Sequence, residues 1–183
     1  MNDKARRVVL TRSAEGCSRW RSRIEALGHE VVSLPVIRFA TLPADGLDLS
    51  KYSGVILTSP QGAKAFRAVF ERAQVRVNPS IATMGKATRL ALDGSGWRDT
   101  VGVEAGSGKE LAVALSQRLS SPGRLLLPGA ERRHVEPALT LRAAGFEVEE
   151  LALYRTEPIA AADLPVNPTH EGDFLFFASP SAV

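Results

Sequence analysis

Residues 56–63 read ILTSPQGA, and residues 176–183 read FFASPSAV. Both stretches are an apolar run that ends in a small residue, followed by Ser-Pro and then by small residues again. The serine is a good N-cap, and the proline suits the first position of a helix, where its missing N–H has no partner to lose. Each stretch therefore predicts a buried strand that leads directly into a helix, which is typical of α/β folds.

The repetition extends beyond these two stretches. With an offset of 117 residues, GHEV at 28–31 aligns with GFEV at 145–148, and with an offset of 120 residues Ser59-Pro60 aligns with Ser179-Pro180. The difference of three residues falls in a connector, where insertions are tolerated. The pattern indicates a duplicated domain, and a chance match between similar α/β units is the alternative.

Strand-like runs alternate with helical patterns along the whole chain. Cys17, Trp20, Ile24 and Leu27 recur at the spacing of one helical face, and Gly28 ends that helix. The expected strands are residues 8–11, 31–34, 55–58, 81–84, 101–103, 125–127, 148–153 and 174–178. Because several of these runs are continuously apolar, the sequence predicts the α/β class, with parallel sheets covered on both faces.

Two proline-bounded segments, LPVIRFATLP and LALYRTEPIAAADLP, occupy corresponding places in the two copies. We expect them to be extended crossover connectors at residues 35–43 and 151–158. Residues 1–34 and 159–183 would then form a first, discontinuous and incomplete domain, and residues 44–150 would form the second. Each should be a doubly wound parallel sheet, and a cleft between the two would be the natural binding site.

Composition and charge exclude several classes of protein. The net charge of +3 is mildly basic, and the sequence lacks the basic stripe with interleaved aromatics that nucleic-acid binders usually carry. The single Cys17 cannot form an internal disulfide, no apolar run approaches the ~20 residues of a membrane span, and the N-terminus lacks an apolar signal region. We therefore expect a cytoplasmic protein that binds neither nucleic acid nor a membrane.

Familiar catalytic and metal motifs are not matched. In AGSGKEL at 105–111, Lys109 is followed by Glu110 rather than by Ser or Thr, so the phosphate-loop pattern fails. The three histidines, at 29, 134 and 170, have no metal-ligand spacing. Ser59 lacks the glycine pattern of a hydrolase nucleophile. The sequence therefore predicts no metal site and no nucleotide cofactor.

The ordered set of segments resembles the uroporphyrinogen-III synthase family. The segments that carry the resemblance are VVLTR, GHEVVSLPVIRF, GVILTSPQGAKAF, IATMGKATRLAL, SGKELAVAL, GFEVEELALYRTEP and FLFFASPSAV. It implies two α/β domains joined by two crossovers, and a cofactor-independent hydro-lyase of porphyrin and haem biosynthesis. That enzyme cyclises hydroxymethylbilane to uroporphyrinogen III, with inversion of the last pyrrole ring and loss of water. The expected partner is this small polycarboxylate tetrapyrrole, and we expect a monomer.

This chain departs from the family pattern at three places. Pro128-Gly129 stands where the family usually has Arg-Gly, and Arg89 follows Thr88 where the family usually has Ala. The family also continues beyond SPSAV. By the repeat, the second copy reaches the equivalent of residue 63, so we expect counterparts of residues 64–124 to be missing and the 183 residues to have little synthase activity.

The resemblance also suggests site residues. It implies that Tyr154, on the second connector, donates a proton to the departing hydroxyl, with a half-buried structural tyrosine as the alternative. Helix N-termini and arginines bind carboxylates, and capping or surface roles are the alternatives. The candidates for substrate binding are Arg12, Ser59, Thr88, Arg133 and Ser179.

Two other functions remain open from the sequence. One is a non-catalytic tetrapyrrole- or small-anion-binding module derived from this fold. The other is an unrelated two-lobed ligand-binding protein, which would be favoured if the two crossovers were absent.

Overall fold

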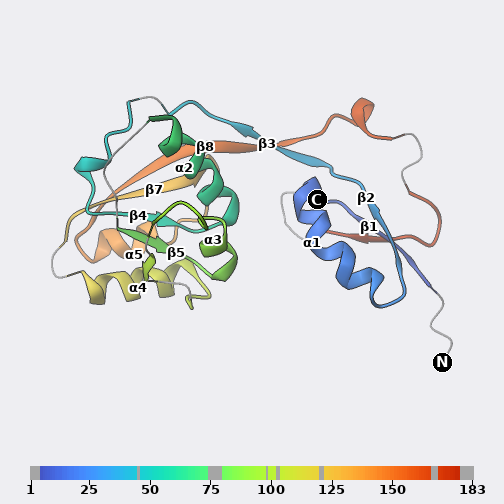
Figure 1. Ribbon diagram of the computed structural model, residues 1–183, viewed down its shortest axis with the longest axis horizontal. Coiled ribbons are helices and arrows are strands. Elements are labelled where there is room, and N and C mark those ends of the chain that lie inside the picture. Colours follow the sequence, from blue (N-terminus) through green and yellow to red (C-terminus); the bar gives the residue numbers. More distant parts are fainter. Residues whose placement is uncertain are drawn as a thin grey trace. The chain divides into compact units, whose positions relative to one another are not determined.

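The computed structural model describes residues 5–44, 46–73, 80–97, 99–101, 104–119, 122–165 and 169–177. The chain divides into two compact units, one formed by Met1–Ala40 with Thr156–Val183 and the other by Thr41–Arg155. Figure 1 shows that both divisions fall within extended strands, β3 (Ile37–Thr41) and β8 (Glu147–Pro158). That each unit folds as an independent domain stays a prediction.

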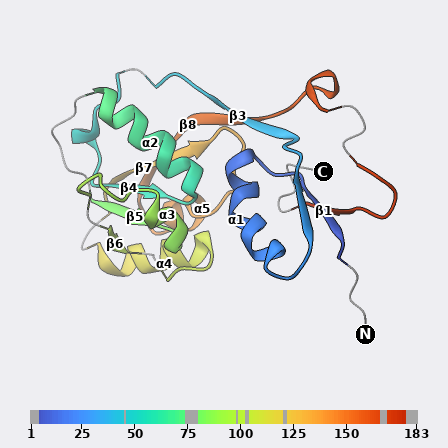
Figure 2. The ribbon, with the colours of Figure 1, turned by 45° about the vertical axis from the view of Figure 1, so that its right-hand side comes forward.

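The first unit contains a parallel sheet in the order β2-β1-β9. Its elements are β1 (Arg7–Leu10), α1 (Ala14–Glu25), β2 (Glu30–Ser33), the short 3₁₀ helix η2 (Ala161–Asp163) and β9 (Phe174–Phe176). Ser13 caps α1 by accepting a hydrogen bond from Gly16 N–H. Figure 2 shows α1 beside β1, and Leu10, Cys17 and Val31 form the buried cluster between them.

The second unit contains a larger sheet in the order β3-β8-β7-β4-β5-β6. Its other strands are β4 (Gly54–Leu57), β5 (Ile81–Thr83), β6 (Asp99–Val101) and β7 (Arg124–Ala130). The neighbours from β8 to β6 all pair in parallel. The edge strand β3 is antiparallel to β8, because Val36 bonds to Ile159 whereas Leu42 bonds to Leu153.

Helices cover both faces of this larger sheet (Figure 1). They are α2 (Pro60–Ala73), α3 (Lys86–Leu90), α4 (Gly108–Arg118) and α5 (Ala138–Ala143), with a 3₁₀ helix η1 at Leu49–Lys51. Helices α4 and α5 share a core with Ile56 and Leu125, whereas Phe66 of α2 is buried against Trp97 with ring centroids 5.3 Å apart. Every residue of β4 is buried, as expected of a strand covered on both faces.

The repeat in the sequence is also a repeat in the structure. The order β2-β1-β9 in the first unit matches β8-β7-β4 in the second. The equivalent strand pairs are Val8–Val31 with Leu125–Val148, and Val8–Phe174 with Leu125–Gly54. The same offsets of 117 and 120 residues therefore map one set of registers onto the other, as the predicted duplication requires.

Three local expectations were wrong. Leu27 is 74% exposed, because α1 ends at Glu25 before the apolar face reaches it. The apolar pattern of residues 135–144 predicts a helix, but α5 begins only at Ala138, because Pro137 lacks an N–H and disfavours the helical conformation in the residue before it. Arg133 therefore lies in the loop between β7 and α5 and does not open a helix. The helix expected after Ser179 lies outside the described residues.

Candidate functional site

The topology of the second unit marks one edge of its sheet as a place for a ligand. From β4 the chain adds β5 and β6 on one side, and it then crosses to add β7 and β8 on the other. The connections that leave β4 and β7 therefore diverge to opposite faces of the sheet. In doubly wound sheets, a ligand crevice opens at the carboxyl ends of two such strands.

A cavity of about 500 Å³ lies at this point. It is bounded by the carboxyl ends of β4, β5 and β7, by the β7–α5 loop, by the start of α4 and by one residue of β8. The lining residues are Thr58, Ser59, Met84, Ser107, Gly108, Lys109, Leu127, Gly129, Ala130, Arg132, Arg133, His134, Val135, Glu136 and Tyr154. Of the predicted site residues, Ser59, Arg133 and Tyr154 therefore lie around one cavity.

Ser59 joins β4 to α2 at the wall of the cavity. Its Oγ accepts a hydrogen bond from Gly62 N–H at 3.0 Å, so the predicted cap is confirmed. A Cβ on Gly62 would lie 3.1 Å from Ser59 Oγ and 3.6 Å from the Cα of Gly129. The small residues after Ser-Pro therefore let the first turn of α2 approach the end of β7.

Tyr154 contributes a phenol to the same wall. The residue is only 7% exposed, and its hydroxyl lies 3.4 Å from Ser59 Oγ, at which distance either oxygen can donate. Its carbonyl accepts a hydrogen bond from Glu131 N–H at 2.8 Å. The pairing of β7 with β8 shifts register between Gly129 and Ala130, which places Tyr154 rather than Leu153 opposite Ala130. The strand pairing thus fixes the height of the phenol in the cavity.

The Arg133 side chain is anchored by contacts with β7 and β8. Its Nη1 donates to Leu127 O at 2.7 Å, and its Nε lies 3.6 Å from Glu150 Oε2. Burial lowers the pKa of the Arg133 guanidinium from its ordinary value, whereas Glu150 and Tyr154 act in the opposite direction. An arginine stays protonated at neutral pH in spite of such a shift, so the cavity wall carries a positive charge.

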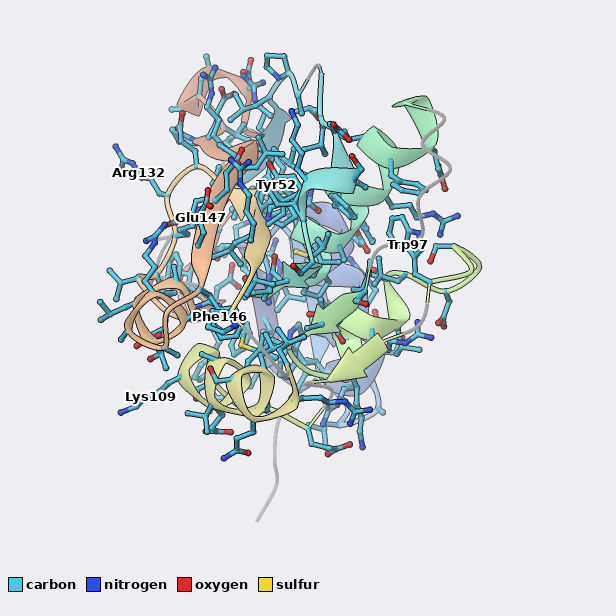
Figure 3. All side chains as sticks on the ribbon, turned by 90° about the vertical axis from the view of Figure 1, so that its left-hand side faces the viewer. Tyr52, Trp97, Lys109, Arg132, Phe146 and Glu147 are labelled. Atoms are coloured by element: carbon cyan, nitrogen blue, oxygen red, sulfur yellow. The ribbon has the colours of Figure 1, made fainter. Side chains whose placement is uncertain are left out.

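Two further cations stand at the rim, and sequence reasoning missed both as binding residues. Lys109 and Arg132 are exposed, and in Figure 3 their side chains extend away from the ribbon. Within the described part of the chain, neither side chain has an ion-pair or hydrogen-bond partner. The sequence signals were a lysine in the first turn of a helix and the pair Arg132-Arg133, of which only the second member was predicted as a candidate.

Among the described residues that line the cavity, Glu136 is the one carboxylate, and α5 supplies its hydrogen-bond donors. Glu136 accepts hydrogen bonds from Thr140 N–H at 3.2 Å and from Thr140 Oγ1 at 2.8 Å. A Cβ on Gly108 would lie only 3.0 Å from the backbone carbon of Glu136, so the glycine permits this loop to rest on α4. The rim is therefore basic, and its arrangement suits an anionic ligand.

Two other predicted binding residues, Thr88 and Arg12, are not among the residues that line the cavity. Thr88 is 2% exposed within the short helix α3, where its N–H bonds to Gly85 O. Arg12 is an exposed residue of the first unit, and its side chain lies over Gly16. Ser179 lies outside the described residues. Their contacts with substrate stay predictions.

Among the described residues, no group of three or more His, Cys, Asp or Glu side chains could hold a metal ion. None of the helices in the described ranges is both long and apolar enough to cross a membrane.

Comparisons with known proteins agree on a single family. A curated relative, the "Porphyrin biosynthesis protein HemD" of Ruminiclostridium josui, is 24% identical over 163 residues, which is 84% of this chain and 32% of the relative. A mutant uroporphyrinogen III synthase from Thermus thermophilus matches with a TM-score of 0.62 and 17% identity over 85% of this chain and 64% of its own. The synthetase from Helicobacter pylori matches with a TM-score of 0.55 and 14% identity over 86% of this chain and 66% of its own.

The structural matches support the predicted α/β fold with parallel sheets. The chain spans about a third of the curated relative and just under two thirds of these synthases. The family model described as uroporphyrinogen-III synthase HemD matches residues 18–183. On this match over nearly the whole length, the chain belongs to the uroporphyrinogen-III synthase HemD family.

Proposed function

We propose that the protein cyclises hydroxymethylbilane to uroporphyrinogen III with loss of water, and that the cavity of the second unit holds the reacting end of the substrate. The observation that carries this proposal is the pair of hydroxyls in the cavity wall, with Tyr154 Oη 3.4 Å from Ser59 Oγ. Family membership supports a synthase. The exact reaction and the roles of the residues are our proposal.

The chemistry needs a proton donor at the first step. The bond between a methylene carbon and its hydroxyl oxygen breaks, the electron pair leaves with the oxygen, and a proton from Tyr154 turns the departing group into water. The carbon is left as a cation conjugated with its pyrrole. Ring closure and rearomatisation then release a proton, which restores the phenol, so the proton balance of Tyr154 closes over one turnover.

The rim supplies charge for the substrate's carboxylates. Lys109 and Arg132 carry cations at two sides of the opening, one on α4 and one on the β7–α5 loop. Arginine can bind a carboxylate through two parallel hydrogen bonds, and lysine acts as a point charge. We assign them to binding and assign the chemistry to Tyr154.

The deciding experiment is an isomer assay. The purified protein is incubated with freshly generated hydroxymethylbilane, without added metal or nucleotide, and the products are oxidised and separated. We expect the type III isomer above the background of spontaneous closure to type I, at a low rate in keeping with the little synthase activity expected from the sequence repeat. If only type I forms at the uncatalysed rate while the ligand still binds, the protein is a binding module and the catalytic proposal is wrong. If type III forms only with a dialysable cofactor, the cofactor-independent mechanism is wrong.

A further inference from the structure

Glu150 joins two arginines behind the wall of the cavity. Its Oε1 lies 3.0 Å from Arg142 Nη2, and its Oε2 lies 3.6 Å from Arg133 Nε. Arg142 Nη2 also donates to Val148 O at 2.7 Å. Two guanidiniums share one carboxylate, so the group keeps a net positive charge.

This network holds the Arg133 cation in one place. Leu127 and Glu150 face each other across the β7–β8 ladder, and Arg133 contacts the carbonyl of the first and the carboxylate of the second. The Arg133 side chain is only 17% exposed. A cation that is already desolvated and oriented needs little reorganisation when a negative charge forms beside it.

Tyr154 is the group beside which such a charge would form. Arg133 and Tyr154 line the same cavity, and Arg133 Nη1 lies 4.0 Å from a Cβ built on Gly129, the neighbour of the residue that pairs with Tyr154. A fixed cation near a phenol favours the negatively charged form of that phenol. The other charged or titratable groups around the cavity are Lys109, Arg132, His134 and Glu136, with Glu150 behind Arg133. Lys109, Arg132 and His134 are exposed, so water and salt screen them more strongly than Arg133.

We propose that Glu150 and Arg142 are positioning residues for Arg133, and that Arg133 stabilises the phenolate left when Tyr154 gives up its proton. Tyr154 is only 7% exposed, so its phenolate would otherwise lose much of its hydration. Arg133 is thereby given an electrostatic role toward Tyr154, in place of the carboxylate contact expected from the sequence. The catalytic meaning of this network rests on the proposed function, whereas the effect on Tyr154 does not.

The chain offers a direct readout, because it has only two tyrosines. The other, Tyr52, lines a separate pocket with Arg124 and Glu149, and burial together with a hydrogen bond to Glu149 raises the pKa of Tyr52 to about 12. In a Tyr52→Phe background, the ultraviolet absorbance of tyrosinate reports Tyr154 alone. The titration needs no substrate.

The experiment compares three substitutions in that background. With Arg133→Met, we expect the tyrosinate midpoint to rise by about one pH unit, the lower end of the effect of an adjacent opposite charge. With Glu150→Gln, loss of positioning should also raise the midpoint, whereas simple removal of a negative charge would lower it. Arg132→Met, a neighbouring exposed cation, is the matched control and should move the midpoint less than Arg133→Met.

Each result decides the proposal. An unchanged midpoint in Arg133→Met overturns it, and a lowered midpoint in Glu150→Gln overturns the positioning role. If Arg133→Met does not fold, as judged by circular dichroism, the isosteric Glu150→Gln variant tests the proposal, because its tyrosinate midpoint is also expected to rise. Absence of type III product with the expected shifts would count against the proposed function alone.

Discussion

Three strands in each unit share their order and register, but the chemistry of the two units differs. With the offset of 117 residues, Tyr154 of the second unit corresponds to Ile37 of the first, which is buried and has no proton to give. The carboxyl end of β1 is closed by Thr11, whose Oγ1 donates to Phe176 O at 3.1 Å, whereas the carboxyl end of β7 opens into the cavity. The two units therefore share the ladder of these three strands and differ in the side chains beyond the strand ends.

Each unit also places an arginine next to a glycine, but the two residues exchange their positions in the sequence. In the first, Arg12 covers Gly16, so that a Cβ on this glycine would meet Arg12 Cδ at 2.6 Å. The same offset relates Arg12 to Gly129 and Gly16 to Arg133. In the second unit the arginine therefore comes from the loop after β7, and its Nη1 lies 4.0 Å from a Cβ built on Gly129. The arginine of the second unit is anchored to Leu127 and Glu150, whereas that of the first is exposed.

The largest expected effect concerns the position at which the units differ most. Tyr154→Phe should lower kcat by about 10²–10⁴-fold, the usual contribution of a general acid, with little change in KM. Tyr52→Phe, in the other pocket, is the control and should retain activity. Steady-state formation of the type III isomer measures both. A normal kcat with a raised KM would show that the phenol binds substrate instead.

The next effect concerns the glycines that allow close approach. Gly108→Ala should lower the free energy of unfolding by about 1–3 kcal/mol, because its Cβ would press on the backbone of Glu136, which cannot move aside alone. Gly16→Ala in the first unit meets only the flexible Arg12 side chain and should cost less. Urea unfolding of both variants gives the comparison. Equal losses would show that the two loops are equally rigid.

A smaller effect is expected at the rim. Lys109→Met and Arg132→Met should each raise KM by about fivefold, the equivalent of ~1 kcal/mol, with kcat unchanged, and the difference should shrink as salt rises. Lys51→Met, a lysine near Asp48 in the other pocket, is the control. Arg12→Met tests the first unit in the same assay. A rise in KM as large as that of Arg132→Met would extend binding to that unit.

The smallest effect is a pH dependence confined to the first unit. The backbone N–H of His170 and then Arg7 hold the pKa of Asp173 below its ordinary value of 3.8. A carboxyl whose folded pKa is lowered contributes stability above its unfolded pKa, and that stability is lost as the pH falls through the folded pKa. Asp173→Asn should therefore reduce amide protection in β9 at about pH 6 and make no difference near pH 2. An equal loss at both pH values would contradict the assignment.

The helix cap and the strand register could be predicted from the sequence. The Ser59-Pro60 cap depends on neighbours along the chain, and the duplicated register follows from the aligned offsets. The spacing of Ser107 and Glu110 predicts a capping box, and Ser107 Oγ does accept from Glu110 N–H. The Glu110 carboxylate, however, accepts from Gly106 N–H and from the Ser107 hydroxyl rather than from the Ser107 N–H. Such a choice between adjacent donors depends on loop geometry that the residue pattern does not encode.

Long-range contacts in the site could not be predicted from the residue pattern. Tyr154 was singled out through the family resemblance, and its hydroxyl meets Ser59 from 95 residues away. Arg133 was expected to face a ligand, yet a carboxylate on β8 already holds it. Lys109 and Arg132 gain a role only because the fold brings α4 and the β7–α5 loop to one cavity.

The Glu110 carboxylate at the start of α4 has a consequence for how this site can be altered. Ser107 Oγ accepts from Glu110 N–H and the Glu110 carboxylate accepts from Gly106 N–H, so the chain's own side chains cap the start of α4. Lys109 stands between them with its side chain in solvent, so a mutation there changes the attraction for a ligand without removing the cap. The charge at the rim of the cavity and the cap of α4 can therefore be changed independently by substitutions at these neighbouring positions.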